Sequence, residues 1–133
     1  MNVYEGITQR RSQRSFIDRK IDDDIIIKLL TAAIMAPSWK NLQPWKMFVV
    51  NKDNQKIKML ADLSIYETWL KTSSCMILIF LDKKSSYHYI KDVQAIGAAI
   101  QNVLLSAIEF GLGACWIGEI LKKENEVKEL LKI

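Results

Sequence analysis

The 133-residue sequence predicts a mixed α and β domain, and three patterns support this prediction. Segments with the apolar spacing of helices alternate with short apolar segments that are typical of strands. A continuous apolar run over residues 75–81 is flanked by serines and charged residues, which is typical of a strand buried on both faces. Residues 92–110 are helical in pattern and apolar almost all round, as in a helix at the centre of a protein.

The elements of the N-terminal half follow in order. Residues 2–10 predict a short helix that ends at a cluster of arginines. The aspartates at positions 22–24 provide an N-cap and an acidic first turn for a second helix, which Pro37 ends because it disfavours the helical conformation of the preceding residue. Residues 45–50 predict a strand, and residues 53–63 predict a helix. The residues of that helix expected to face inward are Ile57, Leu60 and Ala61.

The C-terminal half continues the alternation. Gly111 and Gly113 follow the long helix and are expected to end it, as glycines just past a helix commonly do. Residues 114–117 predict a short apolar strand, and residues 121–131 predict a last amphipathic helix. We find no linker, repeat or low-complexity tract, so residues 1–133 are expected to form a single domain.

Composition and charge argue against several classes of protein. Half of the residues are apolar and 26% are charged, as in ordinary soluble domains. The net charge of +4 is modest and most lysines alternate with acids, as in residues 122–129, so we expect no nucleic-acid partner. The longest apolar run is too short to cross a bilayer and the N-terminus shows no export signal, so we expect no membrane partner and a cytoplasmic location.

The residue types that bind metals are sparse. Cys75 and Cys115 make no metal-ligand spacing with each other or with the only histidine, His88. Both cysteines lie in apolar segments, so we expect buried free thiols in a reducing compartment and no metal site. His88 is expected in a surface loop, although its segment leads into the long helix and could meet a substrate. Trp39, Trp69 and Trp116 could each stack on a ligand or lie in the core, and Trp69 is expected in the core.

All four arginines lie within ten residues, at positions 10, 11, 14 and 19, whereas the other fifteen basic residues are lysines. The planar guanidinium of arginine matches phosphate oxygens two at a time, whereas a lysine is a hydrated point charge. Ser12 and Ser15 add hydroxyl donors to the same segment. This cluster predicts a site for a planar anion, and the alternative is a solvated basic turn.

A second motif lies between the only two prolines, Pro37 and Pro44. The loop that they bound carries Ser38, Asn41 and Gln43, which offer amide and hydroxyl donors and acceptors. A rigid loop with such groups at a helix–strand junction is a common way to hold the edges of a planar heterocycle. The alternative is a stiff structural turn in which the amides satisfy nearby backbone groups.

Together the two motifs resemble those of the nitroreductase family of flavin enzymes. Members of that family carry Arg-Arg-Ser-x-Arg near the N-terminus, then a helix, then Ala-Pro-Ser-x-x-Asn-x-Gln-Pro-Trp. Residues 10–14 and 36–45 match these patterns in order and spacing. Residues 92–102 are similar to the start of the family's central helix, and residues 111–118 to the turn after it. The resemblance runs from about residue 6 to the end of the sequence.

The resemblance implies an α+β fold with a central, mostly antiparallel sheet flanked by helices. It also implies a homodimer with the long helix at the interface and two flavin sites between the subunits. Arg10, Arg11, Ser12 and Arg14 would hold the phosphate and ribityl chain of FMN. Two further groups of residues would contact the isoalloxazine ring, and the second group would lie near its reactive N5 edge. The first group is Pro37, Ser38, Trp39 and Asn41, which the resemblance places in the other subunit, and the second group is Trp116, Ile117 and Gly118.

The activity that the resemblance implies is electron transfer from NADH or NADPH, through FMN, to nitroaromatics, quinones or similar small acceptors in a ping-pong cycle. FMN is expected rather than FAD, because one compact arginine cluster serves the phosphate and no glycine-rich loop is present for a second one. The flavin itself carries the chemistry, so no catalytic triad is expected. The alternatives are an FMN-binding protein without turnover, and a different flavin reaction such as enoate reduction or dehalogenation.

The sequence departs from the family pattern at its C-terminal end. Family members usually continue well past Ile133, with a strand that crosses onto the partner's sheet and a basic residue near the phosphate. The missing strand could weaken the dimer without abolishing it, and the strength of FMN binding is left open, with the N-terminal arginines as the main phosphate ligands.

Overall fold

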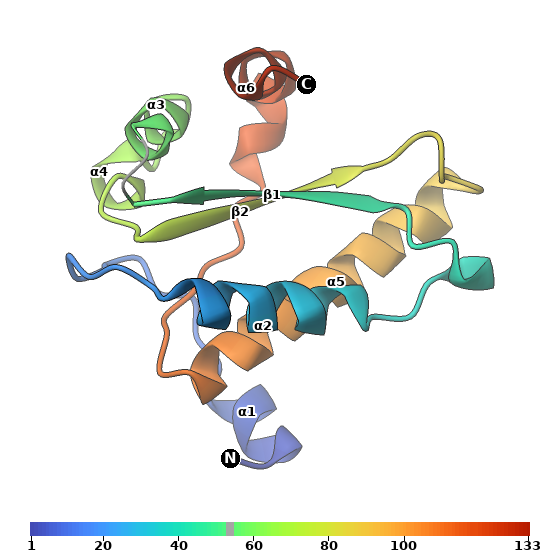
Figure 1. Ribbon diagram of the computed structural model, residues 1–133, viewed down its shortest axis with the longest axis horizontal. Coiled ribbons are helices and arrows are strands. Elements are labelled where there is room, and N and C mark those ends of the chain that lie inside the picture. Colours follow the sequence, from blue (N-terminus) through green and yellow to red (C-terminus); the bar gives the residue numbers. More distant parts are fainter. Residues whose placement is uncertain (53–54) are drawn as a thin grey trace.

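The computed structural model describes residues 1–52 and 55–133, and it shows a small sheet between two layers of helices (Figure 1). Strands β1 (Trp45–Asn51) and β2 (Cys75–Leu81) pair in antiparallel register, with Trp45 opposite Leu81 and Asn51 opposite Cys75. The predicted α+β class with an antiparallel sheet is therefore confirmed.

Helices make up most of the other elements. Helices α2 and α5 cover one face of the sheet, while α3, α4 and α6 lie on its other side (Figure 1). Helix α1 lies near the C-terminal end of α5, away from the sheet (Figure 1). The bounds of the helices are α1 Val3–Gln9, α2 Asp23–Ile34, η1 Trp39–Asn41 (a 3-10 turn), α3 Lys56–Asp62, α4 Glu67–Leu70, α5 Tyr89–Glu109, η2 Glu119–Lys123 (a 3-10 turn) and α6 Glu124–Leu131.

The alternation of side chains along the strands divides the core into two clusters, one on each face of the sheet. The cluster toward α2 and α5 contains Ala33, Ala36, Trp45, Ala95 and Ala99. The cluster toward α3 and α6 contains Val50, Ile57, Leu60 and Val127. Strand β2 contributes to both clusters, but all seven of its residues are only half-buried. The prediction of a strand buried on both faces is therefore too strong for the chain on its own.

The long helix α5 ends at a glycine, as predicted. Gly111 has a φ of +69°, which a residue without a side chain adopts readily. Its N–H donates to the Ile108 carbonyl at 2.9 Å, and the Leu112 N–H donates to the Ala107 carbonyl at 2.8 Å. These two bonds form a Schellman motif, which satisfies carbonyls at the helix end. The motif turns the chain into the segment that leads to the pocket described below.

Several predicted elements differ from the observed ones. Residues 114–117 form no strand, because the chain there pairs through Ala114 alone with Ser12 rather than with β1 or β2. The predicted helix 121–131 divides into η2 and α6, and α5 begins at Tyr89, three residues before its predicted start. Helix α3 begins at Lys56, and the predicted start at residue 53 lies outside the described residues. The short helix α4 was not predicted.

Helix α5 is buried along one stripe rather than on all sides. Its buried residues include Ala95 and Ala99, which pack in the cluster toward α2 and the sheet, whereas Ile90 and Val93 are 62% and 43% exposed. The prediction of an entirely buried helix is therefore wrong for the chain on its own. No helix within the described ranges, 1–52 and 55–133, is long and apolar enough to cross a membrane.

The two cysteines and the histidine all lie outside the buried core. Cys75 and Cys115 are free thiols, but both are half-buried rather than buried as predicted. Partial burial still raises the pKa of Cys75 to about 11, because the thiolate is poorly solvated there. His88 is exposed at the N-cap of α5, as expected for a surface position.

Candidate functional site

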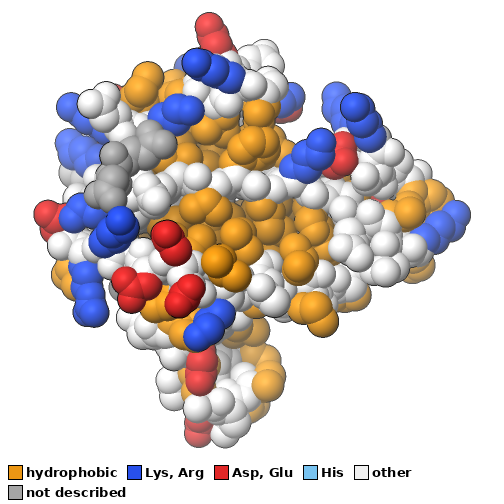
Figure 2. Space-filling view, in the orientation of Figure 1, with side chains coloured by type: hydrophobic (Ala, Val, Ile, Leu, Met, Phe, Trp, Pro, Cys, Tyr) orange, Lys and Arg blue, Asp and Glu red, His pale blue; other side chains and the backbone are white. Residues whose placement is uncertain are grey.

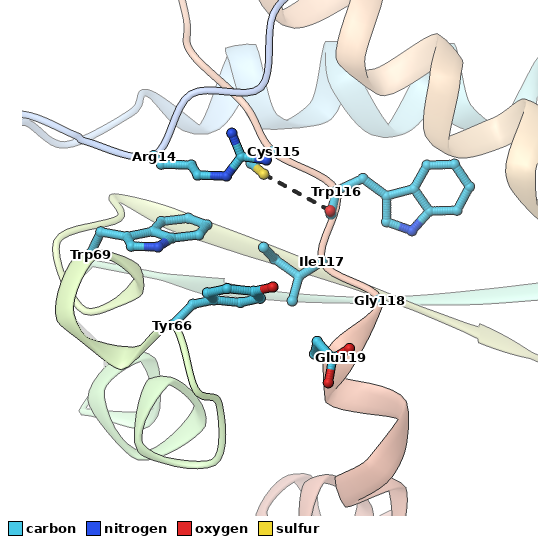
Figure 3. Close-up of a pocket in the computed structure, with 8 residues that line it drawn as sticks. All are labelled: Arg14, Tyr66, Trp69, Cys115, Trp116, Ile117, Gly118 and Glu119. Carbon is cyan, nitrogen blue, oxygen red and sulfur yellow. Dashed lines mark hydrogen bonds between the residues drawn. The ribbon is translucent and has the colours of Figure 1, made fainter.

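A cavity of about 280 Å³ lies where three segments distant in sequence meet (Figure 3). One segment carries Arg14, the second carries two aromatic residues of the α4 region, and the third follows the end of α5 and leads into η2. The lining residues are Arg14, Tyr66, Trp69, Cys115, Trp116, Ile117, Gly118 and Glu119. The cavity therefore joins part of the arginine cluster to all three residues of the predicted 116–118 group.

The arginine segment is held beside the third segment by main-chain contacts. The Gln13 N–H donates to the Ala114 carbonyl at 3.0 Å, and Ser12 forms a parallel bridge with Ala114. Gly113 allows this approach, because a Cβ at position 113 would lie 2.8 Å from Cγ of Gln13. The backbone of residues 12–14 therefore runs directly along residues 113–115, which places Arg14 at the cavity.

The arginines of the cluster have different environments. Arg11 turns back onto α1, where its Nη1 donates to the carbonyls of Thr8 at 2.7 Å and Arg10 at 2.8 Å. Arg10 is half-buried, and its N–H donates to the Gly6 carbonyl. Arg14 extends across the cavity toward Cys115 (Figure 3). Within the described ranges none of the four arginines forms an ion pair.

Aromatic rings form one wall of the cavity. Tyr66 and Trp69 lie with ring centroids 5.7 Å apart, and Phe16 packs on Trp69 at 6.2 Å. Trp69 is half-buried and faces the cavity, so its expected place in the core is wrong. Tyr66 was not predicted, although the spacing of residues 66 and 69 puts both side chains on one side of a helical turn.

The charge of the cavity is dominated by Arg14. Glu119 is the acidic residue of the lining, but its Oε2 lies 2.9 Å from Nζ of Lys122. The hydrogen bond from Lys122 to Glu119 raises the pKa of that lysine above its usual value. Because the negative charge of Glu119 already has a partner, the guanidinium of Arg14 remains available for a ligand.

The predicted 116–118 group lines the cavity mainly through its backbone. The Trp116 ring turns away from the cavity (Figure 3), is 55% exposed, and lies against Gly97 of α5. Ile117 points between Arg14 and Tyr66 (Figure 3). Gly118 has open space where a side chain would stand, so a flat molecule can approach the backbone at this point.

The second predicted motif forms a strained and internally bonded loop. Lys40, Asn41 and Gln43 have φ values of 53°, 52° and 51°, which are uncommon for residues other than glycine. The Gln43 N–H donates to Ser38 Oγ at 3.0 Å, and Gln43 Nε2 donates to Asn41 Oδ1 at 3.3 Å. The loop therefore satisfies some of its own polar groups, as in the structural alternative. Its Pro37 is exposed, and its Trp39 ring is 52% exposed.

The two predicted halves of the site do not meet within one chain. Helix α2 has twelve residues and connects them, and at 1.5 Å per residue it separates its ends by about 18 Å. The arginine segment precedes α2, and the loop of residues 37–41 follows it beside the start of α5 (Figure 1). Among residues 1–52 and 55–133, no group of three or more His, Cys, Asp or Glu side chains could hold a metal ion.

Taken together, these features describe an α+β protein with a cavity in which one arginine side chain lies beside two aromatic residues. The model of the Nitroreductase family matches residues 7–69 and 61–133. An Archaeoglobus fulgidus protein named "Putative NADH dehydrogenase/NAD(P)H nitroreductase" is 38% identical over 128 residues, which cover 96% of this chain and 72% of that protein. The chain belongs to the nitroreductase family.

Solved structures agree with this assignment. A crystal structure described as a "putative nitroreductase in complex with FMN" from Desulfovibrio desulfuricans superimposes with a TM-score of 0.96 at 37% identity, covering 100% of this chain and 77% of that one. A nitroreductase family protein from Clostridium novyi NT superimposes with a TM-score of 0.86 at 31% identity, covering 100% of this chain and 77% of that one.

Proposed function

We propose that the chain binds FMN and passes electrons from NADH or NADPH to a nitroaromatic, a quinone or a similar small acceptor. The observation that carries the proposal is the cavity in which the guanidinium of Arg14, which has no ion pair among residues 1–52 and 55–133, lies beside Tyr66 and Trp69. Family membership and the FMN in the complex from Desulfovibrio desulfuricans support the choice of cofactor.

The residues of the cavity fit part of an FMN molecule. A flavin is a flat ring system with polar edges, and aromatic walls with a few placed donors suit such a ligand. Arg14 supplies a charged donor, the 117–118 backbone supplies an open edge, and Tyr66 with Trp69 supplies the wall. A cavity of about 280 Å³ is about the smallest size of a small-molecule pocket, so it suits part of this cofactor.

We infer that the remainder of the site comes from a second copy of the chain. Pro37, Ser38, Trp39 and Asn41 lie at the opposite end of α2 from the arginine segment, so within one chain they lie away from the cavity beside Arg14. A homodimer with two-fold symmetry would bring the loop of one subunit to the arginines of the other. This argument supports two shared sites per dimer.

The surface of the chain supports such an assembly. Hydrophobic side chains gather over α2 and the sheet in Figure 2. On α2 and at its C-cap, exposed apolar side chains follow one stripe, with Ile27 59%, Ile34 47% and the C-cap residue Met35 75% exposed. Large exposed apolar stripes of this kind mark interaction sites in soluble proteins.

In this proposal the protein orients the reactants and shields them from water. FMN, when bound, supplies the redox chemistry. Arg14 and the neighbouring Arg10 hold negative charge on the cofactor, and Ser12 adds a hydroxyl donor. The aromatic wall fixes the plane of the ring system, and the exposed ring of Trp39 covers it from the other subunit. The second substrate then binds in the space that the first one leaves, as a ping-pong cycle requires.

Spectroscopy of the purified protein reconstituted with FMN tests the proposal. We expect a flavin absorbance spectrum that bleaches when NADH or NADPH is added without oxygen, and that returns when a quinone or nitroaromatic is added. A protein that binds FMN but is not bleached would be a passive flavin carrier. A protein that binds no FMN at all would contradict both functions.

A further inference from the structure

Two lysines and two aromatic rings converge at the end of the molecule opposite Arg14. Nζ of Lys40 lies 4.1 Å from the ring centroid of Tyr87, and Nζ of Lys91 lies 4.5 Å from that of Trp39 and 5.1 Å from that of Tyr87. Lys91 also donates to the Tyr87 hydroxyl at 3.2 Å. We call these four residues the lysine–aromatic cluster. Trp39 and Lys40 come from η1, whereas Lys91 comes from the first turn of α5.

The positive charge of this cluster has no acidic partner among the described residues. Neither Lys40 nor Lys91 forms an ion pair in residues 1–52 or 55–133. The nearby carboxylate of Asp92 is buried, and its Oδ2 already accepts bonds from Ser86 Oγ and from the backbone N–H groups of Tyr87 and His88. The two ammonium groups therefore leave the cluster with a net positive charge.

The two lysines lower the pKa of Tyr87. Its pKa lies below the usual value, first because Lys91 donates a hydrogen bond to the hydroxyl and then because of the charges of Lys91 and Lys40. Asp92 acts in the opposite direction but does not outweigh them. The environment of the Tyr87 hydroxyl therefore favours negative charge.

The rings are accessible, and the loop that carries Lys40 is held in place. The side chains of Trp39 and Tyr87 are 52% and 43% exposed. Lys40 has a φ of 53°, and the loop that follows it is closed by the bond from the Gln43 N–H to Ser38 Oγ. The ammonium groups lie over these rings, and partly exposed rings beside cations are suited to a ligand that is itself flat and negatively charged.

From this arrangement we propose that the lysine–aromatic cluster binds the anionic group of an aromatic substrate, such as a carboxylate on a nitroaromatic acceptor. The ligand's ring would pack against the exposed part of Tyr87, while its anionic group would meet the ammonium groups of Lys40 and Lys91. The assignment rests on the proposed function, because that function places Trp39 against the flavin. It adds that the acceptors preferred by this chain carry negative charge.

Direct binding tests the cluster without turnover. Titration of the FMN-reconstituted protein with benzoate and with benzamide, followed by calorimetry, compares a charged ring with a neutral one of similar shape. We expect benzoate to bind more tightly, and the Lys40→Gln and Lys91→Gln substitutions each to weaken benzoate binding by about fivefold while leaving benzamide binding the same. The matched control is Lys58→Gln, on the exposed side of α3, which should change neither titration.

Turnover separates the acceptor from the electron donor. With NADH as donor, the ratio of kcat/KM for 4-nitrobenzoate to that for 4-nitrobenzamide should fall in the double variant Lys40→Gln/Lys91→Gln, and the KM for NADH should remain unchanged. A raised KM for NADH with an unchanged acceptor ratio would assign the cluster to the donor's phosphates and overturn the proposal.

Other outcomes distinguish this proposal from the proposed function. Equal binding of benzoate and benzamide by the parent protein would overturn the anion site, while bleaching of the flavin by NADH would leave the oxidoreductase function standing. A loss of FMN affinity in the lysine variants, with benzoate binding unchanged, would make the cluster part of the cofactor site instead. Selective binding of benzoate without any flavin reduction would support the site and contradict the function.

Discussion

Gly113 and Gln13 lie so close that a Cβ added to Gly113 would stand 2.8 Å from Cγ of Gln13 and 3.0 Å from its Cβ. This contact lies beside the bond from the Gln13 N–H to the Ala114 carbonyl. The position of the arginine segment therefore depends on a glycine that is far from it in sequence. A side chain at position 113 would push residues 12–14 away from the cavity.

We expect the Gly113→Ala substitution to weaken FMN binding by about tenfold or more, because it displaces Arg14, and to lower stability by about 1–3 kcal/mol, as overpacking does. Calorimetric titration with FMN and chemical denaturation measure the two effects. The matched control is Gly111→Ala, where φ is +69° and no atom lies within 4 Å of an added Cβ. The control should lose about 1 kcal/mol of stability through backbone strain and keep its FMN affinity. Equal FMN affinity in both variants would contradict the proposed role of this contact.

Replacement of Arg14 by alanine should lower the affinity for FMN by about one to two orders of magnitude, since charge-assisted hydrogen bonds contribute about 1.5–3 kcal/mol. Arg10→Ala is expected to behave similarly. Arg19→Ala is the matched control, because Arg19 is exposed and does not line the cavity. Fluorescence titration of FMN measures all three. If Arg14→Ala and Arg19→Ala bind FMN equally well, the cavity is not part of the cofactor site.

Arg11 should behave differently from its neighbours. Its Nη1 donates to the carbonyls of Thr8 and Arg10, so it satisfies groups at the C-terminal end of α1. We expect Arg11→Ala to lower the free energy of unfolding by about 1 kcal/mol and to change FMN affinity less than Arg14→Ala does. Thermal unfolding and FMN titration of the same two variants provide the check. An FMN affinity that falls as far in Arg11→Ala as in Arg14→Ala would show that Arg11 leaves α1 to bind the cofactor.

Much of the fold could be predicted from local patterns. The bounds of β2 match the apolar run 75–81, and the buried residues of α3 are those expected from their spacing. The strand predicted at residues 114–117 was wrong. A short apolar segment is compatible with a strand in many contexts, and only tertiary contacts decide whether it pairs with a sheet. Here its partner is Ser12. Helix α4 was not predicted, because its four residues are too few to show a helical spacing of apolar side chains.

The candidate site could be predicted in composition but not in arrangement. The arginine cluster and the 116–118 group were expected near one ligand, and Arg14 does share a cavity with residues 116–118. Tyr66 was not expected there, and for Trp69 the core was preferred to a stacking role, because an aromatic residue on a pocket wall and one in the core have the same local sequence pattern. Only the packing of α4 against residues 14–16 distinguishes the two cases.

Asp92 should make stability depend on acid pH. Its pKa is lowered, chiefly by the hydrogen bond from Ser86 and also by the N–H groups of His88 and Tyr87. Because the folded pKa lies below the unfolded one of about 3.9, the carboxylate stabilises the fold above that pH, and this contribution is lost as pH falls through the folded pKa. We expect Asp92→Asn to be less stable at neutral pH and to show a flatter decline below about pH 4. Denaturation curves at several pH values test this. Asp62→Asn, at an exposed position, is the control. If the stability of the parent protein and of Asp92→Asn declined in parallel as the pH falls, the assignment would be contradicted.

The exposed stripe of α2 should couple assembly to cofactor binding. Ile27 and Met35 are separated by about two helical turns on the same face and are 59% and 75% exposed. If this stripe is the interface, Ile27→Glu/Met35→Glu places charges against apolar surface of the partner subunit, and the dimer should dissociate at micromolar concentrations. FMN affinity should fall in parallel by at least about tenfold, because each flavin would lose the loop of residues 37–41 from the other chain.

Light scattering and FMN titration over a range of protein concentrations measure both effects together. Met59→Glu serves as the matched control, because Met59 is 52% exposed but lies on α3, on the opposite side of the sheet. That variant should remain dimeric and bind FMN as the parent does. A monomeric Ile27→Glu/Met35→Glu variant that keeps full FMN affinity would show that one chain builds the whole flavin site, and a dimeric variant with full affinity would place the interface elsewhere.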